Sequence, residues 1–145
     1  MSDLGAPVDD GFCLACGRLS PLGLRMEFAF GDDGSAESRV TLPRAFQGWR
    51  GVAHGGTVAL LLDEAMAYAA AARGIRGVTA DLALRFRHAV PIEAPLIVRG
   101  DVLWQRARVL RIAATVRDEG GTVLASGEGS FVSRGRLAAG ERLGA

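Results

Sequence analysis

Apolar residues follow two different periods along this chain of 145 residues. In the run from residue 78 to 89, apolar and charged side chains alternate, so that Leu82, Leu84 and Phe86 face one way while Arg85 and Arg87 face the other. A period of two is typical of a β-strand that packs one face on a core and turns the other to water. Further strand-like runs, bounded by proline, glycine or aspartate, occupy residues 24–30, 36–42, 95–106, 108–118 and 122–133.

One long segment breaks this alternation. Residues 55–73 consist mostly of Ala, Leu and Met without proline, and Gly74 follows where a helix cap belongs, so this segment is predicted to be a helix. Its apolar side chains surround the axis instead of forming one stripe, which predicts burial by a surrounding sheet or by a partner chain. Two strands, one buried helix and four strands indicate an α+β fold with an antiparallel sheet packed on one helix.

Length and composition indicate one domain. A chain of this length with 49% hydrophobic residues suits a single core, and we expect one domain over 1–145 with a folded body at about 13–133. Residues 1–11 are expected to be poorly ordered and residues 134–145 to form a mobile tail. The apolar stretches are too short to span a bilayer, so a cytoplasmic protein without membrane contact is expected. A net charge of +1 with scattered arginines argues against nucleic-acid binding.

Cys13 and Cys16 form a CxxC pair near the start of the chain. A structural zinc site takes four ligands, and the two histidines, His54 and His88, lie far along the sequence. A thioredoxin-like motif would need a strand before the pair and a helix opening at it, whereas the residues that follow favour turns. We therefore expect two small hydrophobic side chains in a loop, with no metal and no cofactor.

Asp63 and Glu64 are adjacent carboxylates at the centre of the otherwise apolar helix. Successive helical residues point about 100° apart, so at most one of the two faces a shared cleft. Glu64 is expected at the rim, paired with an arginine. Asp63 is either a buried, hydrogen-bonded side chain or a catalytic carboxylate, and spacing alone does not decide between them.

The segment that opens the helix ends in His54-Gly55-Gly56. Glycines allow another group to approach the backbone closely, and the first N–H groups of a helix have no acceptor within it. Such groups, aided by the positive end of the helix dipole, can donate to a polarised carbonyl as an oxyanion hole. Flexible turns use the same residues, so the motif taken alone is weak.

The distance between these two features has a consequence for assembly. Asp63 lies eight residues after Gly55 (63 − 55 = 8), which is about 12 Å along a helix at 1.5 Å per residue. Attack on a carbonyl held by Gly55 needs an approach to about 3 Å. If both groups act in one reaction, they must come from different subunits, and antiparallel pairing of two helices would create two equivalent sites.

Residues 46–70 read FQGWRGVAHGGTVALLLDEAMAYAA and resemble the helix-opening motif of hotdog-fold acyl-CoA thioesterases related to phenylacetyl-CoA thioesterase. The shared features are His-Gly-Gly, an Asp nine positions after the His (63 − 54 = 9) and an upstream Phe-Gln-Gly. The N-terminal CLACGRLSPLGLRMEF also resembles a leader found in one branch. The resemblance runs from Cys13 to about Ser133. It implies a hotdog fold that hydrolyses acyl-CoA at dimer interfaces, in a homodimer or homotetramer.

The resemblance also implies roles for individual residues. Asp63 would be the nucleophile or general base, and the Gly55 N–H would polarise the thioester carbonyl. His54 would position this loop and the substrate, and Thr79 would help to orient the attacking water.

Further substrate contacts are expected around this centre, at Gly56, Gln47 and Gly48. Some relatives carry an Asn where this chain has Gly48, so any contribution from that Asn is missing or replaced. Arg85 and Arg87, on the polar face of their strand, are candidates to bind the CoA phosphates by charge-assisted hydrogen bonds.

Two other functions stay open at this level: a hotdog dehydratase acting on hydroxyacyl thioesters, and a non-catalytic acyl-CoA-binding protein. A dehydratase needs a His and a carboxylate that both transfer protons on the substrate, whereas His-Gly-Gly favours carbonyl polarisation. A binding protein would keep the pocket but would not need an ionised Asp63. The acyl group is not determined, because pocket depth depends on strands of two subunits.

Overall fold

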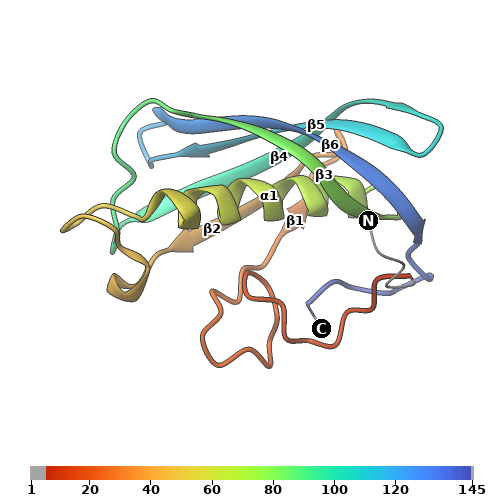
Figure 1. Ribbon diagram of the computed structural model, residues 1–145, viewed down its shortest axis with the longest axis horizontal. Helices are drawn as coiled ribbons and strands as arrows, with labels where there is room; N and C mark the ends of the chain where they lie inside the picture. The colour runs from red at the N-terminus through yellow and green to blue at the C-terminus, as the bar shows by residue number, and fades with distance from the viewer. Residues whose placement is uncertain (1–5, 145) are drawn as a thin grey trace.

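One long helix, α1, lies across a single antiparallel sheet of six strands in the computed structural model, which describes residues 6–144 (Figure 1). The strands follow the order β1-β2-β4-β5-β6-β3 across the sheet, and every neighbouring pair is antiparallel. This arrangement confirms the predicted α+β fold class. The elements are β1 (Ala29–Phe30), β2 (Ala36–Thr41), the short 3-10 helix η1 (Arg44–Phe46), α1 (Gly55–Ala71), β3 (Ile75–Phe86), β4 (Pro95–Arg106), β5 (Val109–Arg117) and β6 (Val123–Arg136).

Helix α1 begins at Gly55, as predicted, and ends at Ala71, two residues before the expected end. Gly74 closes the turn that follows: it adopts φ +73°, and its N–H donates to the Ala71 carbonyl at 2.8 Å. A left-handed conformation at this point favours glycine, which is why the sequence marks the helix end so clearly. No helix within residues 6–144 is long and apolar enough to cross a membrane.

The strands occupy nearly the expected segments, with one large difference at the start of the sheet. The run 24–30 contributes only Ala29–Phe30 as a strand. The N–H groups of Leu24 and Met26 donate to the carbonyls of Leu14 and Ala15, at 3.0 and 2.9 Å, so this stretch pairs with the N-terminal loop instead of the sheet. At the other end, β6 continues to Arg136, beyond the expected limit at residue 133.

The sheet packs closely on one side of α1. At Gly100 in β4, an added Cβ would lie 2.2 Å from the Ala65 carbonyl oxygen, so only glycine allows the helix to approach this strand. Large side chains of the helix and the inner sheet face complete this part of the core, including Leu61, Leu62, Met66, Leu96, Leu110, Ile112 and Phe131.

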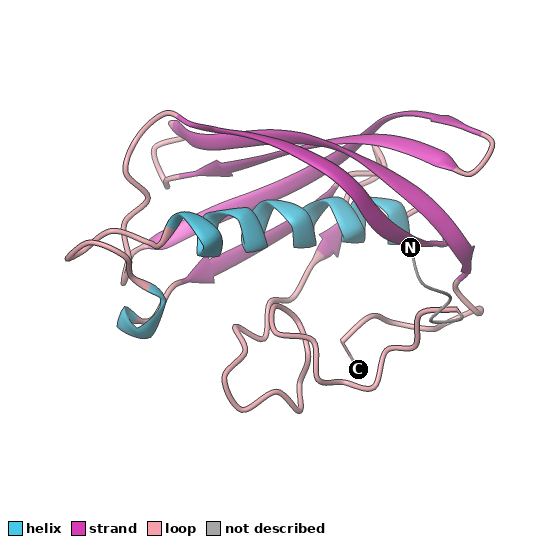
Figure 2. Cartoon of the chain, in the orientation of Figure 1, coloured by secondary structure: helices cyan, strands magenta, loops and turns pink. Residues whose placement is uncertain are grey.

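The side of α1 away from the sheet is covered by the N-terminal segment (Figure 2). Ala15 and Met26 belong to the core, and the ring of Phe28 stacks on Tyr68 with centroids 4.2 Å apart and planes at 15°. The sequence predicted that a sheet or a partner chain would bury the all-round apolar helix. The structure adds a third contributor, the chain's own N-terminal segment.

Both ends of the described chain make specific contacts. The Tyr68 hydroxyl donates to the Leu143 carbonyl at 3.0 Å, and the Gly144 N–H donates to the Asp9 carboxylate. Arg76 forms an ion pair with Glu141. These contacts connect the C-terminal segment, which composition predicts to be mobile, to the N-terminal loop, α1 and β3.

Candidate active site

Asp63 lies on α1 opposite the first half of β3, where its carboxylate meets Thr79. The Thr79 hydroxyl donates to Asp63 Oδ1 at 2.7 Å, and both residues are half-buried. No other hydrogen bond to the Asp63 carboxylate occurs within the part of the chain that the structure describes. One carboxylate oxygen is therefore held by Thr79, and the second is free to face another group.

The loop before α1 is closed by backbone pairing. Gln47 and Ala53 form an antiparallel bridge, and the His54 N–H donates to the Phe46 carbonyl at 3.0 Å. Gln47 Oε1 accepts a hydrogen bond from the Gly51 N–H at 3.2 Å, so this side chain stabilises the turn. A Cβ at Gly48 would lie 3.1 Å from His54 Cα, which shows how closely the two arms approach. Gln47 and Gly48 thus shape the loop that presents His54.

His54 is the N-cap of α1, and it determines which helix N–H groups remain available. Its Nδ1 accepts from the Gly56 N–H at 2.8 Å, and its carbonyl accepts from the N–H groups of Thr57 and Val58. The Gly56 N–H, expected among the substrate contacts, is thereby occupied. The Gly55 N–H has no partner among residues 6–144, and Gly55 is exposed. The helix dipole adds a partial positive charge at the same point.

Phe86 borders this free donor. The nearest atoms to a Cβ placed on Gly55 are two ring carbons of Phe86, both at 3.9 Å. The alternation along β3 predicted Phe86 and Leu82 on the core side, but they are 55% and 36% exposed. The expectation of burial holds for Leu84, which packs on the core, and was wrong for Leu82 and Phe86 in the single chain. Spacing along the sequence gave no signal that Phe86 lies beside Gly55.

Arg85 and Arg87 are exposed, and within the described residues neither forms an ion pair. Arg85 lines a shallow groove together with Arg111 and Glu128. Because side chains alternate along β3, Arg85 projects from the face opposite to Leu84, which packs on the core, whereas Arg87 follows the last residue of the strand. The single chain therefore does not bring Arg85 together with Asp63.

Glu64 occupies a different position from the one expected. It was predicted to be a rim carboxylate paired with an arginine, but no arginine bonds to it within residues 6–144. Instead the Cys13 thiol lies 3.7 and 3.9 Å from its two oxygens. Burial raises the pKa of Glu64, and the nearby Asp63 charge raises it further, while hydrogen bonds from Cys16 and Cys13 act in the opposite direction.

Comparison with known families identifies the chain. The sequence pattern of the thioesterase superfamily matches residues 50–125, which contain the His-Gly-Gly loop, the whole of α1 and most of the sheet. The chain belongs to the thioesterase superfamily. The resemblance of the helix-opening motif to hotdog thioesterases is thus confirmed. None of the curated proteins compared with the chain gives a significant match.

Solved structures agree with this assignment. A crystal structure described as a thioesterase superfamily protein shares 34% identity with a TM-score of 0.80, over 84% of this chain. This chain spans 60% of that protein. A Streptococcus pneumoniae hypothetical thioesterase with coenzyme A shares 18% identity (TM-score 0.73, 78% of this chain and 91% of that one). The E. coli PaaI protein from the phenylacetic acid degradation operon shares 20% (TM-score 0.72, 79% and 83%). The fold of this thioesterase superfamily member is the hotdog fold.

Proposed function

We propose that this thioesterase superfamily protein hydrolyses acyl-CoA thioesters to a free acid and CoA. The observation that carries the proposal is the placement of two complementary groups on one helix: a carboxylate oriented by Thr79 at Asp63, and an unpartnered N–H at Gly55. The first can activate water or attack a carbonyl carbon, and the second can stabilise the oxyanion that forms.

The reaction uses these groups as follows. Asp63 accepts a proton from a water molecule while the water oxygen bonds to the thioester carbon, or the carboxylate itself attacks and water then cleaves the resulting anhydride. The negative charge that develops on the carbonyl oxygen is held by the Gly55 N–H. The carbon–sulfur bond breaks, and CoA leaves with the electron pair and takes up a proton. His54 contributes by fixing the loop and occupying the Gly56 N–H, so that Gly55 alone points outward.

We propose further that each site combines Asp63 of one subunit with Gly55 of another. The two residues are eight positions apart on the same straight helix, about 12 Å along the axis, which is too far for one carbonyl to meet both. Strand β3 supplies a surface for pairing, because it is a sheet edge with Leu82 and Phe86 exposed. An exposed apolar edge strand is a favoured place for a second copy to add.

Relatives support the ligand class and the residues. One similar structure, from Streptococcus mutans, is bound to acetyl CoA, and the S. pneumoniae protein contains coenzyme A. A thioesterase of the same S. pneumoniae description was also crystallised as an alanine variant of an Asp and as an alanine variant of a Thr sixteen positions later. The same spacing separates Asp63 from Thr79 (79 − 63 = 16).

A panel of acyl-CoA thioesters, with release of the CoA thiol as the readout, tests this function. We expect turnover of at least one aryl or aliphatic member, and Asp63→Asn should lower kcat by at least about a hundredfold with little change in acyl-CoA binding. Tight binding without turnover of any member would favour an acyl-CoA-binding protein. Water loss from hydroxyacyl-CoA without thiol release would favour a dehydratase.

A further inference from the structure

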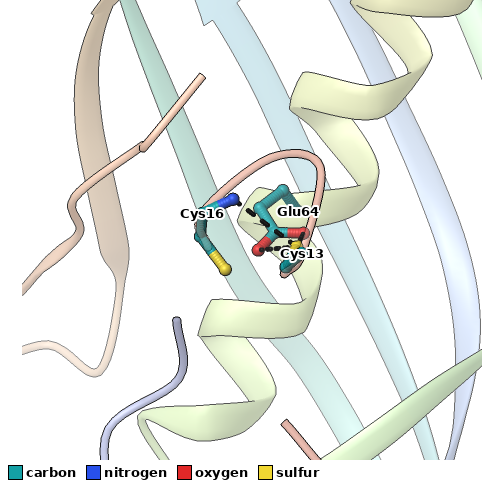
Figure 3. A group of neighbouring side chains, drawn as sticks. All are labelled: Cys13, Cys16 and Glu64. Carbon is teal, nitrogen blue, oxygen red and sulfur yellow. Dashed lines mark hydrogen bonds between the residues drawn. The ribbon is translucent and has the colours of Figure 1, made fainter. Parts of the chain in front are cut away.

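Two sulfur atoms and one carboxylate meet where the N-terminal loop crosses α1 (Figure 3). The ligand atoms of Cys13, Cys16 and Glu64 all lie within 4.8 Å of one another, and Cys13 Sγ is 3.7 Å from Glu64 Oε1. A tetrahedral zinc ion, with bonds of about 2.3 Å to sulfur and about 2.0–2.2 Å to oxygen, places such donors about 3.5 Å apart. We infer that these three side chains bind one zinc ion, which fastens the N-terminal loop to the helix.

The CxxC turn presents both sulfurs to the helix. The Gly17 N–H donates to the Cys13 carbonyl at 2.9 Å, and the Cys16 N–H points at Cys13 Sγ at 3.5 Å. An N–H directed at sulfur favours the thiolate, which is the form that binds metal. A Cβ at Gly17 would lie 2.4 Å from both Cys13 N and the Gly11 carbonyl oxygen, so the tight turn admits only glycine. The tight turn thus holds both sulfurs within 4.8 Å of the Glu64 carboxylate.

The charge balance of the cluster favours a cation. The half-buried carboxylate of Glu64 lies beneath the loop, where the Cys13 thiol is its hydrogen-bond partner, and no arginine bonds to it within the described chain. The three side chains line a cavity of about 390 Å³ together with Arg76. The Arg76 guanidinium, however, donates to the Pro7 carbonyl at 2.7 Å and pairs with Glu141. Burial of a carboxylate is costly unless a positive charge or several donors compensate for it. A zinc ion would supply that charge.

Cysteine binds zinc as the thiolate. Zinc binding would release the thiol protons and leave two thiolates and one carboxylate as ligands. Three protein ligands leave one tetrahedral position, which a water molecule would take, as in open zinc sites.

This inference reverses the expectation of no metal drawn from the sequence. That expectation counted cysteines and histidines, and Glu64 lies 51 positions after Cys13. Folding brings the carboxylate to the cysteines because Glu64 diverges by about 100° around α1 from Asp63, which meets Thr79. The zinc site is therefore separate from the proposed catalytic carboxylate, although the two acidic residues are adjacent.

Metal content of the full chain, purified with its thiols reduced and dialysed against a trace of zinc chloride, tests the inference. We expect about one zinc per chain by mass spectrometry of the metal. Cobalt(II) in place of zinc should give an intense sulfur-to-metal charge-transfer band in the near ultraviolet. Cys13→Ser with Cys16→Ser should abolish both signals, and Glu64→Gln should weaken zinc affinity at least tenfold.

Asp63→Asn is the matched control, because it removes the neighbouring carboxylate but none of the three ligands. It should bind zinc as the unaltered chain does while losing turnover, so that failure of the zinc inference and failure of the proposed function are distinguished. Circular dichroism of each variant establishes that it is folded. Free thiols with less than a tenth of a zinc per chain would overturn the inference, as would zinc retained by the folded double cysteine variant.

Discussion

The Thr79 hydroxyl donates a hydrogen bond of 2.7 Å to Asp63 Oδ1, and it joins edge strand β3 to the buried face of α1. Thr79→Val removes the donor at similar volume and should lower kcat by roughly 10- to 150-fold, since a hydrogen bond to a charged group contributes about 1.5–3 kcal/mol. KM should change little, and Thr79→Ser should restore most of the rate. Steady-state kinetics measures both variants. Equal kcat values for Thr79→Val and Thr79→Ser would contradict this role.

Arg85 and Arg87 are free of ion pairs within the described residues, and we propose that they contact the phosphates of CoA. The double change Arg85→Gln with Arg87→Gln should raise KM for acyl-CoA by about 5- to 20-fold and leave kcat near its original value, because exposed charge pairs contribute at most about 1 kcal/mol each. Added salt should reduce the difference. Arg117→Gln, at another exposed arginine, is the control. An unchanged KM in the double variant would contradict contact between these arginines and the CoA phosphates.

Gly100 marks the closest approach of the sheet to α1. A Cβ at this position would lie 2.2 Å from the Ala65 carbonyl oxygen, so Gly100→Ala should force the helix away and destabilise the fold by about 3 kcal/mol or more. The control is Gly120→Ala, where the nearest atom is Asp118 Oδ1 at 3.4 Å. Denaturant unfolding of both variants measures the effect. Equal stability of the two would contradict the observed packing.

Glu141 fixes the C-terminal segment by accepting the Ala138 N–H and pairing with Arg76. The Ala138 N–H and then Arg76 lower the pKa of Glu141 below its ordinary value near 4.5. Its contribution to docking is therefore fully present above that value and is lost as the pH falls through the lowered pKa. Hydrogen exchange of residues 137–144 should be slow at neutral pH, faster in Glu141→Gln, and no longer different between the two in acid. Fast exchange of these residues in the unaltered chain at neutral pH would contradict docking and support a mobile tail.

The sequence was sufficient for the helix and most strands because each is specified by local pattern. Residues 55–71 combine strong helix formers with a glycine at the end, and β4 occupies the predicted segment 95–106. Local pattern could not predict that the run 24–30 would pair with the N-terminal loop instead of the sheet. Either partner satisfies the same backbone N–H and C=O groups.

The candidate site divides in the same way. Asp63, His54 and Gly55 stand out because charge and paired glycines are unusual around an apolar helix. The place of Phe86 beside Gly55 and the cluster at Glu64 depend on contacts between residues far apart in the chain. Local sequence patterns do not reveal which distant residues meet in space. For Glu64, the general rule that exposed carboxylates pair with arginine was wrong, because its partner is the Cys13 thiol.

Complementation between two inactive variants tests the shared site most directly. Asp63→Asn deletes the charge, and Gly55→Pro deletes the N–H donor. Proline suits this position because it is the first helical residue and His54 before it has φ −58° and ψ 139°, a conformation that precedes proline readily. Gly55→Ala, which keeps the N–H and meets only Phe86 at 3.9 Å, is the control and should stay active.

Each variant alone should be inactive because both of its sites are defective. A mixed dimer would hold one site with both defects and one with neither. Co-refolding of equal amounts makes about half the dimers mixed, so roughly a quarter of the original thiol-release rate should return. No recovered activity, with mixed dimers shown to form and Gly55→Pro shown to fold, would contradict a site built from Asp63 of one subunit and Gly55 of the other.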